Sequence, residues 1–174
     1  MDSLSKEHRS WNMSRIRSTN TKPEMLVRSF LHRNGFRFRL HVKDLPGHPD
    51  IVLPKYKTVI EVRGCFWHRH RGCKYATTPS SNTEFWQTKF NQNIKRDRNH
   101  AKELNALGWN VIVIWECETD KKVFPPRALT DFIDKTKMCS FPHSEKEKIG
   151  PNDKRIKAFF RRSIKKTKRE EQNG

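Results

Sequence analysis

The hydrophobic residues near the start of the chain recur at the spacing of an amphipathic helix. Thr21 and Glu24 form the pattern of a capping box, and Pro23 suits the first helical turn. Four apolar residues then fall on one helical face: Leu26, Val27, Phe30 and Leu31. Gly35 is a typical helix stop, so the pattern predicts a short helix that ends just before it.

Strand patterns follow this helix. Phe36, Phe38 and Leu40 alternate with basic residues and histidine, which is typical of a half-buried strand. Residues 50–53 and 57–63 predict two further strands, joined through the short proline-containing turn between them.

The longest predicted helix covers residues 81–107. Ser81 or Thr83 is the expected N-cap, and Gly108 is the expected stop. Its expected buried stripe consists of Trp86, Phe90, Ile94, Ala101 and Leu104.

An apolar run at residues 109–115 suits a central strand that is covered on both faces, and residues 125–137 predict another short helix. The expected element order is therefore α-β-β-β-α-β-α. This order indicates the α/β class, with a small mixed sheet flanked by helices.

The charge of the chain points to a polyanionic partner. The sequence has 37 Lys+Arg against 19 Asp+Glu, a formal net charge of +18. Residues 140–174 contribute only +6 of this, so residues 1–139 carry +12. A basic tail on an ordinary enzyme would leave the folded part near neutral. The excess in the body instead favours a surface that binds nucleic acid phosphates.

Three regions follow from this distribution. Residues 1–20 form a polar arm whose Arg15 and Arg17 are expected to contact DNA. We expect residues 21–139 to be the folded domain. Residues 140–174 are expected to be a flexible basic tail that adds weaker phosphate contacts.

Membrane and secreted classes fit the sequence poorly. No stretch approaches the roughly 20 apolar residues of a membrane span, and the N-terminus has no apolar signal-peptide core. In an intracellular protein the four cysteines favour metal binding or free thiols over disulfides.

Two acidic residues on neighbouring predicted strands form the first candidate site. Asp50, after Pro49, enters one strand, and Glu61 lies on the next, followed by Arg63. Such acids can hold Mg²⁺ against a scissile phosphate, in a pattern that resembles Pro-Asp…(Asp/Glu)-x-Lys nucleases. Alternatively, Asp50 caps a turn and Glu61 forms a surface ion pair with Arg63.

The second candidate is a metal centre in the loop that follows. Cys65, His70 and Cys73 place three zinc-type ligands within nine residues. Cys117, directly after the apolar strand, is the best candidate for a fourth ligand, and Cys139 is the alternative. The competing interpretation is a set of scattered, reduced thiols.

His68 lies in the same loop and is spare if His70 binds the metal. A histidine held there could act as a general base, although an exposed histidine in a basic loop is an alternative. Asp97 falls on the buried stripe of the long helix, where a carboxylate needs a partner. It could orient His68 or bind a cation, or form a salt bridge with Arg96 or another base.

Phe66 and Trp67 are adjacent in this loop, beside Arg69 and Arg71. In an extended loop both rings cannot easily point into one core. Large apolar side chains next to cations suit insertion between base pairs, so Arg69 and Arg71 are expected to bind DNA together with these two rings. The alternative is that one of the two rings fills the core.

Six separated motifs between residues 9 and 118 resemble the very short patch repair (Vsr-type) DNA mismatch endonucleases. They lie at residues 12–24, 45–50, 64–68, 83–86, 93–97 and 107–117.

This resemblance implies a bacterial cytoplasmic, nucleoid-associated enzyme with a restriction-endonuclease-like fold and a structural zinc. It further implies a monomer that uses Mg²⁺ to nick one strand of double-stranded DNA. The nick lies 5′ of the T in a T:G mismatch left by deamination of 5-methylcytosine. A repair protein or a methyltransferase is a candidate partner.

The resemblance also implies residue roles. Asp50 would be the metal-binding catalytic carboxylate, His68 the general base, and Glu24 and Asp97 supporting acids. The zinc ligands would be Cys65, His70, Cys73 and Cys117, and the DNA wedge would be Phe66, Trp67 and Trp86.

Two positions depart from the family pattern. Some members have Thr where this chain has Val62, and a non-acidic residue in place of Glu61. If the metal binds only the backbone carbonyl, Val62 is harmless; otherwise Glu61 would restore an acidic ligand. The segment from His70 to Cys73 is also one residue longer than the tightest family spacing.

Two rival functions remain at this point. One is a restriction-type nuclease that cuts matched DNA with Asp50, Glu61 and Arg63. The other is a zinc DNA-binding module whose acids are structural.

Overall fold

The computed structural model describes residues 19–139 and the isolated positions 5, 8, 11, 14 and 15. Arg17 and the predicted basic tail lie outside these residues, whereas Arg15 is described and exposed. The chain divides into a compact unit that ends at Ile133 and a second that begins at Asp134. The structure describes the second unit only at residues 134–139.

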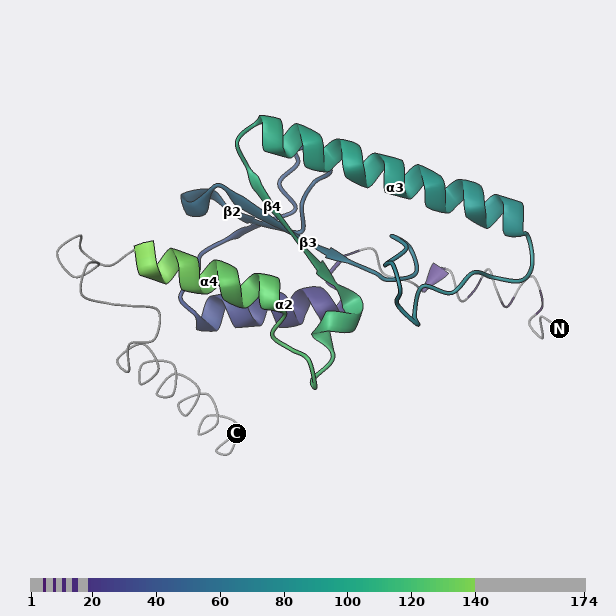
Figure 1. Cartoon of the computed structure of the whole chain (residues 1–174), viewed down its shortest axis with the longest axis horizontal. Helices are drawn as coiled ribbons and strands as arrows, with labels where there is room; N and C mark the ends of the chain where they lie inside the picture. The colour runs from purple at the N-terminus through teal and green to yellow at the C-terminus, as the bar shows by residue number, and fades with distance from the viewer. Residues whose placement is uncertain (1–4, 6–7, 9–10, 12–13, 16–18, 140–174) are drawn as a thin grey trace. The chain divides into compact units, whose positions relative to one another are not determined.

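The element order agrees with the predicted α-β-β-β-α-β-α (Figure 1). The elements are α2 (Lys22–Arg33), β1 (Arg39–Leu40), β2 (Ile51–Leu53), β3 (Thr58–Arg63), α3 (Thr83–Ala106), β4 (Asn110–Trp115) and α4 (Arg127–Cys139). Short 3-10 helices follow β2 at Pro54–Tyr56 and β4 at Glu116–Thr119. Among the described residues, no helix combines the length and apolarity that a membrane span needs.

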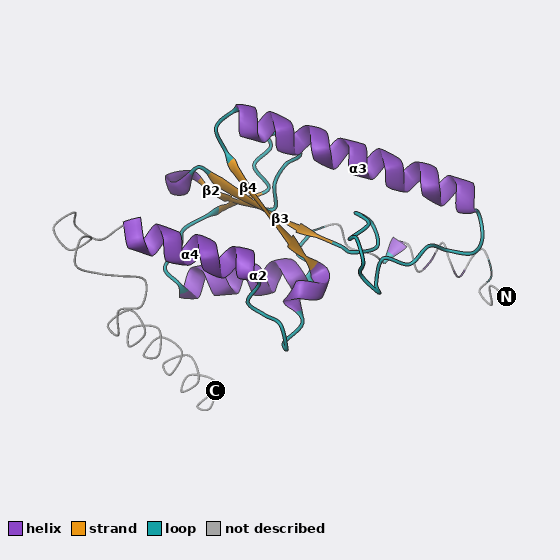
Figure 2. Cartoon of the chain, viewed as in Figure 1, coloured by secondary structure: helices purple, strands orange, loops and turns teal. Residues whose placement is uncertain are grey.

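The four strands form one mixed sheet in the order β1-β2-β3-β4 (Figure 2). β1, β2 and β3 pair antiparallel, and β3 pairs with β4 in parallel, with Ile60 opposite Ile112. The expected mixed sheet is therefore confirmed.

The predicted central position of β4 is wrong, because this strand lies at the edge of the described sheet. Its apolar run reflects helices on both faces: Val111 packs toward α3, and Ile114 packs toward α2 and α4. An apolar run reports coverage of its two faces, and it does not report the number of neighbouring strands.

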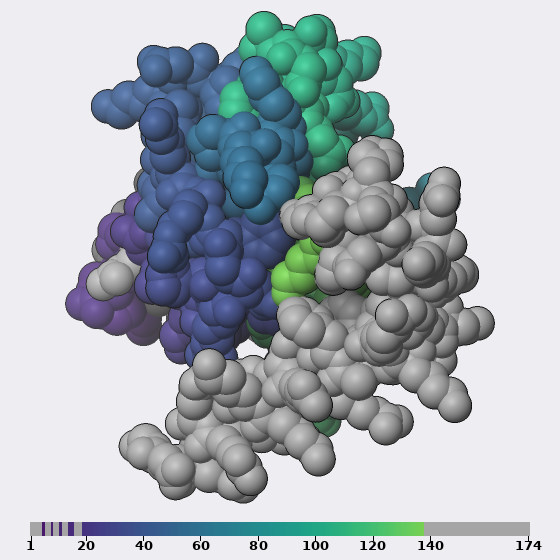
Figure 3. Space-filling model, turned by 90° about the vertical axis from the view of Figure 1, so that its left-hand side faces the viewer, coloured from purple at the N-terminus to yellow at the C-terminus, as the bar shows by residue number. Residues whose placement is uncertain are grey.

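The core lies mainly on one face of the sheet. Val27 and Leu31 of α2 and Leu129 of α4 pack there against Ile51 and Ile60. A smaller cluster on the other face joins Val52 and Val59 to Leu104 near the end of α3. The space-filling view shows the green end of α3 directly above the blue segments of the sheet region (Figure 3).

The predicted start of α2 is confirmed. The Thr21 side chain accepts a hydrogen bond from the Glu24 backbone, and the Glu24 carboxylate bonds back to the Thr21 N–H, which completes the capping box. Gly35 follows the helix at φ +84°, a conformation that suits glycine. Leu26 was expected on the buried face but is 43% exposed.

Three details of the prediction differ from the structure. β1 has only two residues, Arg39–Leu40, and Leu40 is exposed. The N-cap of α3 is Asn82, not Ser81 or Thr83, and it makes no side-chain capping bond.

The buried stripe of α3 also differs from the prediction. Phe90 and Leu104 are buried as expected, together with the polar Asn93, whereas Trp86, Ile94 and Ala101 are only half-buried. Of the buried residues, Leu104 packs on the sheet, whereas Asn93 and Phe90 contact residues of the loop after β3.

Candidate active site and metal centre

A pocket of about 970 Å³ lies between the sheet, the start of α2 and α3. α3 contributes Lys89, Asn93, Arg96 and His100, whose spacing of three and four residues places them on one helical face. Asp50, Glu61, Arg63 and His68 line the same pocket from the sheet and the loop after β3.

The two-residue period of the strands brings the pocket residues to one face. Val52 and Val59 face α3, so Asp50, Glu61 and Arg63, which lie two or four residues from them, face α3 as well. The register of β2 and β3 pairs Ile51 with Ile60, which sets Asp50 beside Glu61. The prediction that these acids come together across neighbouring strands is therefore confirmed.

Asp50 is held by the backbone of the adjacent strand. Its Oδ2 accepts a 2.8 Å hydrogen bond from the Val62 N–H. Burial raises the pKa of Asp50, and the negative charges of Glu24 and Glu61 raise it further, while the Val62 hydrogen bond opposes them. A carboxylate in this situation gains from a bound cation, which would offset the repulsion.

His68 and Asp97 form a close polar pair in the pocket. His68 Nδ1 lies 2.6 Å from Asp97 Oδ2. Burial favours a higher pKa for Asp97, but the hydrogen bond and charge of His68, with Arg63 and Arg96, outweigh it, and the pKa is lowered. Of the partners considered for Asp97, the structure places it on His68 and, at 3.9 Å, beside another base, Arg63. Among the described residues it makes no direct pair with Arg96.

Glu61 and Arg63 form an ion pair, as one of the two alternatives proposed. Arg63 Nε lies 2.9 Å from Glu61 Oε2, and its Nη1 lies 3.9 Å from Asp97 Oδ2. The pair is not on the open surface, since the side chains are only 14% and 15% exposed. Arg63 therefore stands between Glu61 and the His68–Asp97 pair.

Glu24 reaches the pocket from the first turn of α2 and is 3% exposed. Its Oε2 accepts a 2.7 Å hydrogen bond from Arg28, which also donates to Asn20 Oδ1. Arg28 was not predicted as a site residue. The four-residue spacing of a Glu before an Arg on a helix was the signal that could have identified it.

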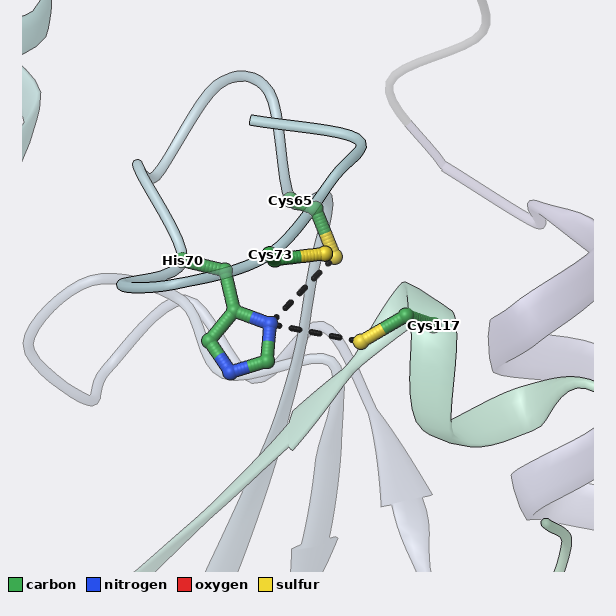
Figure 4. Close-up of side chains that lie close together, drawn as sticks. All are labelled: Cys65, His70, Cys73 and Cys117. Carbon is green, nitrogen blue, oxygen red and sulfur yellow. Dashed lines mark hydrogen bonds between the residues drawn. The ribbon is translucent and has the colours of Figure 1, made fainter. Parts of the chain in front are cut away.

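Four predicted zinc ligands lie together. The ligand atoms of Cys65, His70, Cys73 and Cys117 are all within 4.8 Å of one another (Figure 4). His70 Nδ1 lies 3.6 Å from Cys65 Sγ and 3.2 Å from Cys117 Sγ. Neighbouring N and S ligands of a tetrahedral zinc are separated by about 3.5 Å, so the donor set and its spacing fit this ion.

The surroundings of these side chains hold them in place. The ring of His70 stacks on Trp115 at 4.2 Å, and the backbone N–H of Cys65 donates to Glu116 Oε2. Burial raises the pKa of the Cys65 thiol to about 12, so a bound cation would have to displace its proton. The side chain of Cys139, the alternative ligand, is outside the described residues.

Phe66 and Trp67 are both half-buried and join one aromatic cluster, in a loop that does not have the extended form considered from the sequence. Phe66 lies 5.1 Å from Trp67, 5.5 Å from Trp86 and 5.3 Å from Phe90. The loop is not extended, because it turns back on itself through the His68 N–H to Gly64 carbonyl bond. All three predicted wedge residues are half-buried, whereas Phe90 is 1% exposed.

The two arginines of the loop differ. Arg71 is exposed, as a DNA contact would be, whereas Arg69 donates hydrogen bonds to the loop that follows Cys73.

Asn93 and Glu116 were not predicted as site residues. Asn93 donates to the Trp67 carbonyl, and Glu116 links the metal centre to the pocket wall. Asn93 lies on the same helical face as Asp97, and that spacing could have identified it.

Comparison with known proteins places this geometry in a family. The family model described as DNA mismatch endonuclease Vsr matches residues 1–74. A type II nicking enzyme of Xanthomonas oryzae pv. oryzae is 50% identical over 117 residues, which cover 67% of this chain and 85% of that protein.

The chain belongs to the Vsr family of DNA mismatch endonucleases. A nicking enzyme of Neisseria meningitidis is 48% identical, over 70% of this chain and 86% of its own length. The DNA mismatch endonuclease Vsr of Escherichia coli K12 is 42% identical, over 64% and 71%. As a Vsr-family endonuclease, the protein is a DNA-cleaving hydrolase with a restriction-endonuclease-like fold.

Proposed function

We propose that this Vsr-family endonuclease nicks one strand of double-stranded DNA, 5′ of the T in a T:G mismatch left by deamination of 5-methylcytosine, with Mg²⁺. The observation that carries the proposal is the His68–Asp97 pair in the same pocket as Asp50. Metal-assisted phosphodiester hydrolysis requires a general base and a carboxylate that binds the metal. The pocket offers a histidine oriented by one carboxylate, beside a second carboxylate that can bind a cation.

Asp50 is the proposed Mg²⁺ ligand, and the adjacent Glu61 or the Val62 carbonyl is the proposed second one. Mg²⁺ bound there would polarise the scissile phosphate and stabilise the charge that develops on it. Glu61 would reach the cation only by giving up part of its ion pair with Arg63.

His68 is the proposed general base. Because Asp97 carries the acceptor oxygen, the proton between the two lies on His68 Nδ1, and Nε2 is the nitrogen that can accept another. Nε2 would take the proton of the water that attacks the phosphorus in line. The bond from phosphorus to the 3′ oxygen of the preceding nucleotide then breaks, leaving a 5′ phosphate on the T. Glu24 is proposed as a supporting acid, whose negative charge acts on Asp50 in the same pocket.

The metal centre is proposed to be structural. Zinc at Cys65, His70, Cys73 and Cys117 would cross-link the loop that carries His68 to the end of β4. The four ligands leave no open position for a substrate.

The aromatic cluster and the basic residues are proposed to bind the DNA. Phe66, Trp67 and Trp86 would enter the duplex at the mismatch, where unstacking a base step costs less than in matched DNA. Arg15, Arg17 and Arg71 would contact phosphates. A monomer in the bacterial cytoplasm, at the nucleoid, with a repair protein or methyltransferase as partner, completes the proposal.

Incubation with Mg²⁺ on matched and T:G-containing duplexes, followed by a denaturing gel, tests the proposal. A single-strand product from the T:G duplex alone supports it. Cuts in both strands of matched DNA would instead indicate the restriction-type use of Asp50, Glu61 and Arg63. Binding without any product would indicate a non-catalytic zinc module.

A further inference from the structure

The guanidinium of Arg69 is occupied within the protein. Its Nη1 donates to the carbonyls of Ala76 and Thr77, both at 2.8 Å, and its Nη2 donates to Thr78 Oγ1 at 3.0 Å. These acceptors lie in the segment that leads from Cys73 to α3. Arg69 therefore fastens this segment to the loop that carries the proposed base.

The same guanidinium lies over the floor of the aromatic cluster. Its central carbon is 4.5 Å from the centre of the Phe90 ring, a cation–π distance. Phe90 stacks on Trp86 at 5.7 Å and contacts Phe66 at 5.3 Å. Any displacement of Arg69 would thus reach two of the proposed wedge residues.

The backbone of Arg69 joins two functional positions, since it lies between His68 and His70. Its φ is +54°, in the left-handed region that side-chain-bearing residues seldom adopt. The three hydrogen bonds of the side chain hold the residue in this conformation and thereby fix the turn from the proposed base to the metal ligand.

We propose that Arg69 is a positioning residue, which clamps the loop of residues 64–73 to segment 76–78 and to Phe90, and that it is not a phosphate contact. The inference rests on the proposed function, because it assigns His68, His70 and the aromatic cluster their roles. It differs from the expectation that Arg69 binds DNA, since binding a phosphate would require the guanidinium to give up acceptors it already holds.

Arg71 provides a matched control two residues away in the same loop. It is exposed, and its side chain makes no hydrogen bond or ion pair among those found in the described part of the chain. Removing it changes the charge of the loop by the same amount as removing Arg69, without breaking the clamp.

The first measurement is the salt dependence of binding to a T:G duplex in buffer without Mg²⁺, where we expect no cleavage. The slope of log K against log salt is negative, and the loss of one phosphate contact reduces its magnitude by about 0.9. We expect this decrease for Arg71→Gln and an unchanged slope for Arg69→Gln. This readout does not depend on nicking, so it remains decisive even if the wild-type protein fails to cut T:G DNA.

The second measurement compares the conservative variants in single-turnover nicking. Lys keeps the charge but cannot present a planar fork to three acceptors. We expect Arg69→Lys to lower the rate at saturating enzyme about tenfold to a hundredfold, the scale of a small misplacement of catalytic groups. Saturating enzyme compensates for a weakened phosphate contact, so Arg71→Lys should lower this rate less than Arg69→Lys does. Circular dichroism of each variant checks that it is folded.

A wild-type nicking rate in Arg69→Lys, or a slope reduced by about 0.9 in Arg69→Gln, would overturn the proposal. The first result would mean that nicking does not need the clamp, and the second that Arg69 binds a phosphate.

Discussion

His68 Nδ1 lies 2.6 Å from Asp97 Oδ2, although the two residues are 29 positions apart in the sequence. One comes from the loop after β3 and the other from the middle of α3. Asn93, one turn before Asp97, donates to the Trp67 carbonyl and fixes this helix against the same loop. The pairing is therefore built into the packing of α3 on the loop.

Asp97→Asn should lower the nicking rate by about a hundredfold or more while leaving DNA affinity nearly unchanged. Asn can still accept a hydrogen bond, but it cannot stabilise the charge that His68 gains with a proton. Single-turnover rates and equilibrium binding to the same T:G duplex test this. Parallel losses of rate and affinity would contradict the role of Asp97 as the partner of the base.

Asp50→Asn should raise the melting temperature of the protein in Mg²⁺-free buffer at neutral pH, although it abolishes nicking. The folded-state pKa of Asp50 is raised, chiefly by burial. The protonated side chain therefore stabilises the folded protein fully below about pH 3.9, the pKa of Asp in the unfolded chain. This contribution to the free energy of unfolding is lost as the pH rises through the pKa of Asp50 in the folded protein. Ionised Asp50 thus destabilises the fold at pH 7, and Asn removes that cost while it can still accept from the Val62 N–H.

Thermal melts of wild type and Asp50→Asn at pH 7 and near pH 4 provide the check. The difference in melting temperature should shrink toward the acidic condition. A lower melting temperature for the variant at pH 7 would mean that the Asp50 charge stabilises the metal-free fold.

Periodicity was sufficient to predict the order and type of the elements. The capping box at Thr21, the apolar run before Arg63 and the long helical repeat through Leu104 each express a local rule. The edge position of β4 could not be predicted in this way, because an apolar strand has the same pattern wherever both of its faces are covered.

The candidate site was only partly visible in the sequence. The metal ligands could be found because Cys and His are rare and closely spaced, and Asp97 because a carboxylate on a buried stripe needs a partner. The inward use of Arg69 could not, since arginine is common on this basic chain and nothing local separates a clamp from a phosphate contact.

One zinc per chain should be found by elemental analysis, and Cys117→Ser should lose it together with thermal stability. A structural zinc contributes directly to folding free energy. Cys139→Ser is the control and should keep the metal. Retention of zinc in Cys117→Ser with loss in Cys139→Ser would move the fourth ligand to Cys139.

Trp67→Ala should reduce the preference for T:G over matched DNA more than it reduces general DNA affinity. Trp67 is half-buried, whereas Phe90 of the same cluster is 1% exposed. Phe90→Ala should therefore cost about 3–5 kcal/mol of folding stability. Affinities for both duplexes and urea unfolding separate the two effects, and equal losses for both duplexes in Trp67→Ala would argue for a purely structural role.

The central claim is tested most directly by mapping the cut on a T:G duplex labelled separately on each strand, with Mg²⁺, for wild type and His68→Ala. We expect wild type to release a product only from the T strand, ending immediately 5′ of the mismatched T. His68→Ala should bind the duplex and release none. Cleavage of the G strand, or full activity in His68→Ala, would contradict the account.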